Sequence, residues 1–219
     1  MRGCLVWWLG CILLALAGSA GAAVPSPAAT SRTVLVLGDS LSAAHNIPVA
    51  SGWVQLLDVR LGKMVPEWHV VNASISGETS LSGRNRLPAL LKQYRPGVLV
   101  LELGANDGLR GLPLDRLRGN LAAMLDMAQQ AHARVLLVGI ELPVNYGPLY
   151  RDGLRAVYAD LARQHHVALV PFLLEGIAQH PALMQEDGLH PTAAAQGQVL
   201  GVVWPRLQPL LQEKPADSR

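Results

Sequence analysis

The chain has 219 residues, half of them hydrophobic, and its 18 basic and 16 acidic side chains give a formal net charge of +2. This near balance lacks the excess of positive charge that is typical of nucleic-acid-binding proteins. We therefore expect a small or weakly charged substrate. Two cysteines in the whole chain exclude a disulfide-rich scaffold.

Residues 1–22 have the build of a secretory signal peptide. Arg2 precedes an apolar run from Cys4 to Leu16, and an A-x-A triplet follows at 20–22. The run is short for a membrane span, which favours cleavage over an uncleaved anchor. We therefore predict an exported protein, periplasmic or secreted. Cys4 and Cys11 both lie in this leader, so the mature chain contains no cysteine.

The rest of the chain suits a single domain. We predict a flexible lead-in at 23–32, a domain at 33–212 and a polar tail at 213–219. Apolar runs of strand length, rich in valine and leucine, are typical of parallel strands buried on both faces. These strand candidates are Thr33–Leu37, His69–Asn72, Val98–Leu103, Arg134–Ile140 and Val167–Val170.

Amphipathic stretches separate these strands, at about 53–61, 81–94, 114–128, 150–165 and 192–211. In the third of them, leucines and an alanine recur at spacings of three and four residues. Strands that alternate with helices predict an α/β fold. We expect a three-layer domain with a doubly wound, five-stranded parallel sheet and helices on both faces.

Chemistry in such a fold lies in the loops at the carboxyl ends of the strands. The first loop carries Ser40 in a tight turn before an expected helix. Its hydroxyl would point above the sheet edge, and its N–H would lie near the helix N-terminus. Alternatively, Ser40 caps that helix. A G-x-S-x-G elbow is absent, which argues against an ordinary α/β-hydrolase.

The next two loops contain candidate donors for an oxyanion. Gly77 lacks a side chain, so its backbone N–H is able to face a ligand. Asn106 offers an uncharged amide donor. The alternatives are a loop glycine before a capped helix and an Asn-Asp-Gly turn.

The segment DGLHP, residues 187–191, allows three interpretations: a metal site, a turn into the last helix, or part of a catalytic triad. Asp-Gly is a common turn dipeptide. A nucleophile, two anion-binding donors and a base would however meet at one edge of the sheet. We therefore predict that Asp187 orients His190, which deprotonates Ser40.

Four segments carry a resemblance to a known family: GDSLSA, NASISGET, LGANDGLRG and DGLHP, in this order. With them the chain resembles the SGNH (GDSL) hydrolase family, in particular its exported multifunctional esterase, acyl thioesterase and lysophospholipase branch. The resemblance extends through LPVNYG and covers nearly all of residues 33–211. Ala105 departs from it, because close relatives often carry glycine there, and residues 44–47 also vary within the branch.

The resemblance implies a flavodoxin-like fold and assigns roles to five residues. Ser40, Asp187 and His190 would form the triad. The N–H groups of Ser40 and Gly77 and the amide of Asn106 would form the oxyanion hole. Fatty-acyl esters and thioesters would be hydrolysed through an acyl-serine intermediate, with no cofactor and no metal.

We further expect a monomer that acts on small acyl esters or lysolipids, with transient contact to membrane lipid and no nucleic-acid partner. Tyr146 is a candidate for lining the acyl pocket, and a structural role is equally open. Asp39 is expected to brace the turn before Ser40 through hydrogen bonds.

Several alternative functions remain. The same residues would serve a carbohydrate O-acetyl esterase, and a periplasmic lipid-binding protein could keep the fold without turnover. A zinc hydrolase is disfavoured because H-E-x-x-H is missing. Glu102 and Glu141 lie at strand ends and could form a glycosidase carboxylate pair, but nothing else supports that reading.

Overall fold

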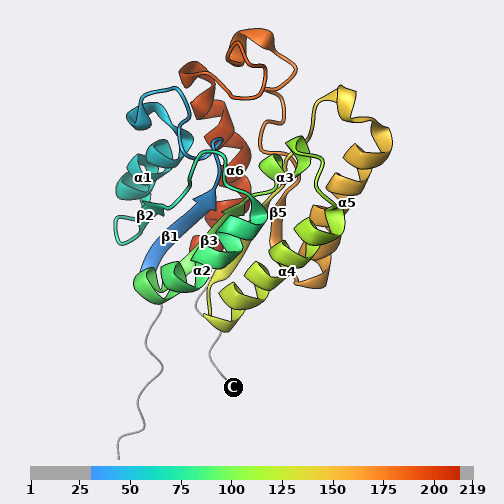
Figure 1. The fold of residues 1–219 in the computed structure, drawn as a ribbon. Helices are drawn as coiled ribbons and strands as arrows, with labels where there is room; N and C mark the ends of the chain where they lie inside the picture. Colours follow the sequence, from blue (N-terminus) through green and yellow to red (C-terminus); the bar gives the residue numbers. More distant parts are fainter. Residues whose placement is uncertain (1–30, 213–219) are drawn as a thin grey trace, which may run out of the picture.

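The structure, a computed structural model, describes residues 31–212 (Figure 1). The predicted leader, most of the lead-in and the tail lie outside these residues. All five predicted strands are present in one parallel sheet. They are β1 Ser31–Gly38, β2 His69–Asn72, β3 Pro96–Glu102, β4 Arg134–Val138 and β5 Ala168–Val170. Their order, β2-β1-β3-β4-β5, is that of the flavodoxin-like doubly wound sheets. The predicted fold class is confirmed.

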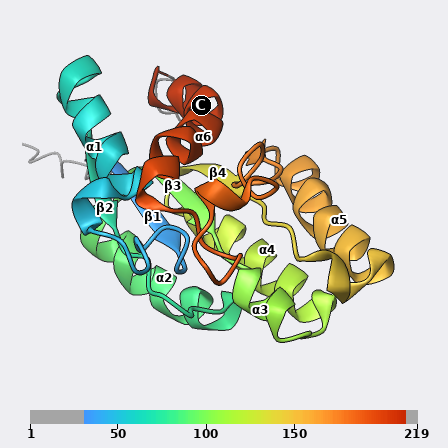
Figure 2. The same ribbon diagram turned by 90° about the horizontal axis from the view of Figure 1, so that it is seen from above.

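Helices cover both faces of the sheet. They are α1 Trp53–Met64, α2 Ser80–Tyr94, α3 Ala105–Leu109, α4 Leu114–Gln130, α5 Pro148–Gln164 and α6 Gln196–Gln212, with short 3-10 turns at Val49–Ser51, Val144–Tyr146, Pro181–Leu183 and Ala193–Ala195. Seen from above, α1 and α6 lie on one side of the sheet and α2 and α4 on the other (Figure 2). None of the described helices is long and apolar enough to cross a membrane.

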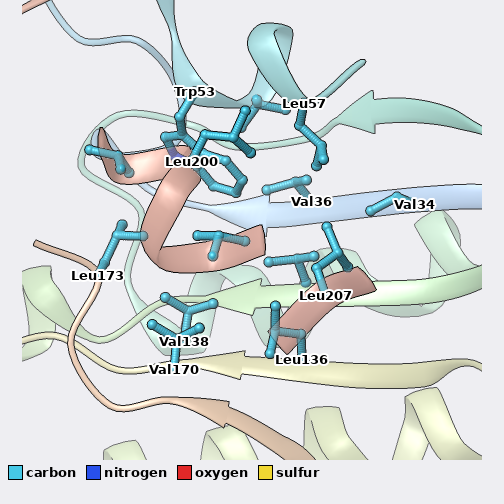
Figure 3. Packing of buried hydrophobic residues seen from close by; sticks show 14 of the residues in the cluster. Val34, Val36, Trp53, Leu57, Leu136, Val138, Val170, Leu173, Leu200 and Leu207 are labelled. Atoms are coloured by element: carbon cyan, nitrogen blue, oxygen red, sulfur yellow. The ribbon is translucent and has the colours of Figure 1, made fainter. Parts of the chain in front are cut away.

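The core consists of two apolar layers, one on each face of the sheet. Alternate side chains of β1 enter each layer: Val34 and Val36 face α1 and α6, while Leu35 and Leu37 belong to the opposite layer. In the first layer the side chains of α1 and α6 pack over the sheet (Figure 3). All four β1 side chains are fully buried, and each such burial contributes roughly 1.5–3 kcal/mol.

The register of the two central strands brings two loops together. Gly38, the last residue of β1, pairs with Glu102, the last residue of β3. The chain segments that carry Ser40 and Asn106 therefore leave the sheet side by side. This is the edge at which a doubly wound sheet binds ligands.

Candidate active site

Ser40 lies in a turn that is not the start of a helix. After Gly38 the N–H groups of Ser42 and Ala43 donate to the Asp39 carbonyl, at 3.2 and 2.9 Å. The next α-helix, α1, begins only at Trp53. The expectation of a helix N-terminus behind Ser40 is therefore wrong, and Ser40 does not cap a helix.

Ser40, His190 and Asp187 form a continuous hydrogen-bonded chain. The distance from Ser40 Oγ to His190 Nε2 is 2.8 Å, and that from His190 Nδ1 to Asp187 Oδ2 is 2.6 Å. Since a carboxylate only accepts, Nδ1 carries a proton and Nε2 is the nitrogen that accepts from the serine hydroxyl. This tautomer suits a general base.

The DGLHP segment is both a turn and part of this chain. Asp187 Oδ1 accepts the N–H groups of Leu189 and His190, at 2.9 and 3.0 Å, while Oδ2 holds the imidazole. A bridge between Met184 and Pro191 closes the segment. The turn and the triad, two of the three interpretations of this segment, therefore describe the same structure. The turn orients the imidazole ring of His190.

Hydrogen bonds keep Asp187 ionised. Its partial burial acts to raise the pKa, but the bonds from the His190 ring and from the N–H groups of Leu189 and His190 outweigh it and lower the pKa to about 2. The carboxylate is therefore charged throughout the pH range in which the imidazole can act as a base.

The candidate oxyanion donors have different surroundings. Among the described residues, the N–H groups of Ser40 and Gly77 have no hydrogen-bond partner. Gly77 has a φ of +81°, a conformation that favours glycine. Asn106 Nδ2 instead donates to Asp39 Oδ2 and to the Glu78 carbonyl, both at 3.1 Å. An oxyanion would have to share or replace one of these two bonds.

Asp39 links the turn after β1, which carries the candidate nucleophile Ser40 and is called the nucleophile turn below, to the Asn106 loop. Its Oδ1 accepts the Leu41 N–H at 3.1 Å and its Oδ2 accepts from Asn106. The side chain is fully buried, and this burial raises its pKa to about 6 against the opposing effect of the two hydrogen bonds. The expected bracing of the turn is present, and the same side chain also orients the Asn106 amide.

A comparison with known families agrees with this arrangement. The pattern of the GDSL-like Lipase/Acylhydrolase family matches residues 36–197, most of the chain. The chain belongs to this family.

Its similarity to individual family members spans most of the sequence. It is 48% identical to "Esterase TesA" of Pseudomonas aeruginosa over 90% of this chain and 98% of the relative. It is 43% identical to "Thioesterase 1/protease 1/lysophospholipase L1" of Escherichia coli K12, over 84% of this chain and 87% of the relative. Among solved structures, the psychrotrophic esterase EstA from Pseudoalteromonas sp. superposes with a TM-score of 0.79 at 38% identity, covering 84% of this chain and all of that one.

Two buried carboxyl groups of this GDSL-like chain have structural roles that the sequence did not predict. Asp107 accepts both the N–H and the hydroxyl of Ser80, at 2.8 and 2.6 Å, and so ties α3 to the start of α2. Glu102 lies beneath the nucleophile turn with no exposed surface. The available signal for Glu102 was an acidic residue inside the apolar run of a predicted strand. Asp107 lies in the loop after that strand, and the partners of both residues are distant in sequence.

The glycosidase interpretation of Glu102 and Glu141 fails on geometry. Glu102 is enclosed, and within residues 31–212 its hydrogen bonds go only to the turn after β1. Glu141 lies near the surface and pairs with Arg151 and Arg155, at 3.6 and 3.3 Å. Neither carboxyl group is placed to act on a shared substrate.

Tyr146 has a structural contact and also borders a hollow. Its hydroxyl donates to the Leu109 carbonyl at 2.8 Å, which joins the loop after β4 to α3. The hollow, of about 500 Å³, is lined largely by apolar side chains that include Leu114 and Leu149. Leu149 is 88% exposed. Both roles considered for Tyr146 are thus compatible with its position.

One group of side chains in residues 31–212 resembles a metal-ligand set. The candidate ligand atoms of His45, Asp187 and His190 lie within 4.8 Å of one another, and the rings of His45 and His190 are 4.4 Å apart. Both nitrogens of His190 are however already hydrogen-bonded. The arrangement fits a hydrogen-bonded triad better than a preformed metal site.

Proposed function

We propose that Ser40, His190 and Asp187 are the nucleophile, the general base and the orienting carboxylate of a serine hydrolase. The observation that carries this proposal is the unbroken hydrogen-bonded chain from Ser40 Oγ to Asp187. The enzyme hydrolyses carboxylic esters and thioesters of fatty acids, as its family membership and its esterase and thioesterase relatives support.

The proposed reaction has two halves. In the first, Ser40 Oγ attacks the substrate carbonyl carbon while His190 Nε2 takes its proton; the tetrahedral intermediate then expels the alcohol or thiol, which receives that proton. In the second, His190 takes a proton from a water molecule that attacks the acyl carbonyl carbon; the tetrahedral intermediate then releases the fatty acid, and His190 returns the proton to Ser40 Oγ. Asp187 stays charged and stabilises the imidazolium in both halves.

The negative charge on the carbonyl oxygen is stabilised by the N–H groups of Ser40 and Gly77 and by the Asn106 amide. The two backbone donors have no competing partner among the described residues. Asn106 is held beside them by Asp39 and Glu78. Donors aimed at the oxyanion bind the transition state more strongly than the substrate.

The acyl chain is assigned to the apolar surface around Tyr146. The hollow there is lined by Leu114, Leu149 and Tyr150, and its size exceeds what an acetyl group needs. A series of aryl esters from acetyl to palmitoyl tests this assignment. Activity that rises toward octanoyl or longer chains supports it, whereas activity confined to acetyl esters would favour a carbohydrate O-acetyl esterase.

We also infer that the enzyme acts outside the cytoplasm as a monomer, with residues 1–22 removed as a leader. The apolar run and the A-x-A triplet support the export and the cleavage. Lysophospholipids and other envelope esters would then be the accessible substrates, reached through transient contact with membrane lipid. The first residue of the protein isolated from the periplasm, read by mass spectrometry, tests it. A chain that still begins at Met1 would contradict cleavage.

A further inference from the structure

Glu102, at the end of β3, supports the nucleophile turn from below. Its Oε2 accepts the Asp39 N–H at 3.3 Å and the Ser42 hydroxyl at 2.7 Å. One oxygen therefore holds the residue just before Ser40 and the residue two positions after it. A Cβ at Gly38 would lie 2.6 Å from the same oxygen. The position of the Glu102 carboxyl therefore explains why the turn must begin with glycine.

The surroundings of Glu102 oppose a negative charge there. The side chain has no exposed surface, and in the described part of the chain no lysine, arginine or histidine pairs with it. Its second oxygen, Oε1, is buried without a hydrogen-bond partner. An ionised carboxylate in such a place costs several kcal/mol.

The titratable groups around Glu102 favour the uncharged form as well. Burial, and then the Asp39 carboxyl from the loop after β1, raise the pKa of Glu102 well above its usual value, against the hydrogen bonds from Ser42 and Asp39. Tyr158 of α5 is the other ionisable neighbour, and Glu102 in turn helps to raise its pKa. His190 and Asp107 act on Asp39 with opposite signs. No described neighbour of Glu102 brings a compensating positive charge into contact.

We propose that Glu102 is a positioning residue that carries its proton at neutral pH and, as an uncharged acid, holds the turn that presents Ser40 to His190. The proposal rests on the proposed function, because it adds a residue to the same site. It also has an electrostatic rationale. Negative charge develops on the substrate oxygen next to Ser40, and a second negative charge under the turn would raise the energy of that transition state.

Two substitutions of Glu102 distinguish its hydrogen bonds to the turn from the ionisation of its carboxyl group. Glu102→Gln keeps an acceptor oxygen for Asp39 and Ser42 and removes the possibility of ionisation. Glu102→Ala removes the support. Glu141→Gln is the matched control, since Glu141 also follows a strand but is ion-paired near the surface. The measurements are kcat and KM for a soluble aryl ester, and melting temperatures between about pH 5 and about pH 9.

Glu102→Gln should keep kcat within about threefold of the wild type. Glu102→Ala should lower kcat roughly tenfold to a hundredfold with little change in KM. The reason is that the variant displaces Ser40 and leaves substrate binding unchanged. A raised pKa in the folded state means that stability is lost as pH rises, because the unfolded chain releases the proton first. The wild type and Glu141→Gln should therefore lose melting temperature from about pH 5 to about pH 9, and Glu102→Gln should lose less.

Three results would overturn the proposal. Glu102→Gln as slow as Glu102→Ala would mean that the carboxylate acts in its charged form. Normal kcat in a destabilised Glu102→Ala would leave only a structural role. If Glu102→Ala does not fold, an equal loss of melting temperature in Glu102→Gln and the wild type would exclude the uncharged acid. Wild-type protein that hydrolyses no ester would instead refute the proposed function, and the melting data would still report the charge of Glu102.

Discussion

At the scale of single residues, Ser40 depends on one contact outside its own turn. His190 Nε2 lies 2.8 Å from its hydroxyl, and the ring is held in turn by a carboxylate whose pKa is lowered to about 2. A lone exposed serine is a weak nucleophile, and in the proposed mechanism a hydrogen-bonded, oriented base activates it. The reactivity that we propose for Ser40 would therefore depend on three side chains.

Replacing the proposed nucleophile should abolish activity without unfolding the protein. Ser40→Ala removes a half-buried hydroxyl and its bond to His190, so ester hydrolysis should fall to background while the melting temperature stays near that of the wild type. A fluorophosphonate probe, followed by peptide mapping, should label Ser40 alone. Labelling at Ser42, Ser74 or Ser76 would contradict the assignment.

Removing the Asn106 amide should act mainly on the transition state. Loss of one oxyanion donor typically lowers kcat by about a hundred- to a thousandfold, and Asn106→Ala should fall in that range with little change in KM. The variant also loses two hydrogen bonds, so a loss of stability of about 1 kcal/mol for each is expected. Kinetics and melting curves on the same sample measure both effects. A destabilised variant with normal kcat would remove Asn106 from the site.

At the scale of elements, the short helix α3 is held by contacts from three other segments. The Tyr158 hydroxyl of α5 donates to the Leu103 carbonyl at 2.9 Å, just before α3. Asp107 binds the first residue of α2, and the Tyr146 hydroxyl binds the Leu109 carbonyl. Five residues cannot form a stable helix alone. These contacts therefore determine where Asn106 lies.

Gly104 tests this dependence because it joins β3 to α3. Its φ is +126°, and a Cβ there would come 2.2 Å from the Tyr158 hydroxyl oxygen. Gly104→Ala should destabilise the fold by about 1–3 kcal/mol or more and should lower kcat, since Asn106 is only two residues away. Urea unfolding and steady-state kinetics measure the two effects.

Gly119→Ala is the matched control. It lies in α4 with open space around the added methyl group, and should gain up to about 1 kcal/mol with unchanged kcat. A Gly104→Ala variant that is as stable and as active as this control would refute the claim that the Tyr158 contact positions α3.

At the scale of the whole molecule, the site affects how stability depends on pH. The pKa of Asp187 is lowered to about 2 in the folded protein. Its contribution to the free energy of unfolding is therefore present above the pKa that the residue has in the unfolded chain, and it is lost as pH falls through about 2. The pKa of Asp39 is raised by burial to about 6. Its contribution to the free energy of unfolding is therefore present below the pKa that the residue has in the unfolded chain, and it is lost as pH rises through about 6. Glu102 acts in the same direction as Asp39.

The free energy of unfolding should therefore be highest in mildly acidic solution and should decrease toward neutral pH. Urea titrations at about pH 3, 5 and 7 measure this dependence. Asp187→Asn should reduce the loss on the acid side and leave the decrease between about pH 5 and 7 unchanged. Stability that rises steadily from about pH 5 to 7 would contradict the raised pKa values at the nucleophile turn.

The sequence by itself determined the elements and the chemistry of the loops. All five strands lie within a few residues of their predicted bounds, because continuous valine and leucine runs are a local signal of burial on both faces. The candidate residues could be named from the sequence because their side chains suit the chemistry and their positions suit a site. Ser40 and Asn106 follow predicted strands, and Asp187 and His190 lie in the DGLHP turn. The helix α3 was missed, since its five residues contain no amphipathic period.

Only the tertiary structure decided which of these side chains meet. Ser40 and His190 are 150 residues apart in sequence, Asn106 and Asp39 are 67 apart, and Ser42 and Glu102 are 60 apart. The order of the strands and the pairing of Gly38 with Glu102 bring them together. Hydrophobic periodicity reports the environment along one segment and carries no information on the partner of a polar atom. The bonds of Asn106, the turn at Ser40 and the burial of Glu102 beneath it arise only when distant segments pack against one another.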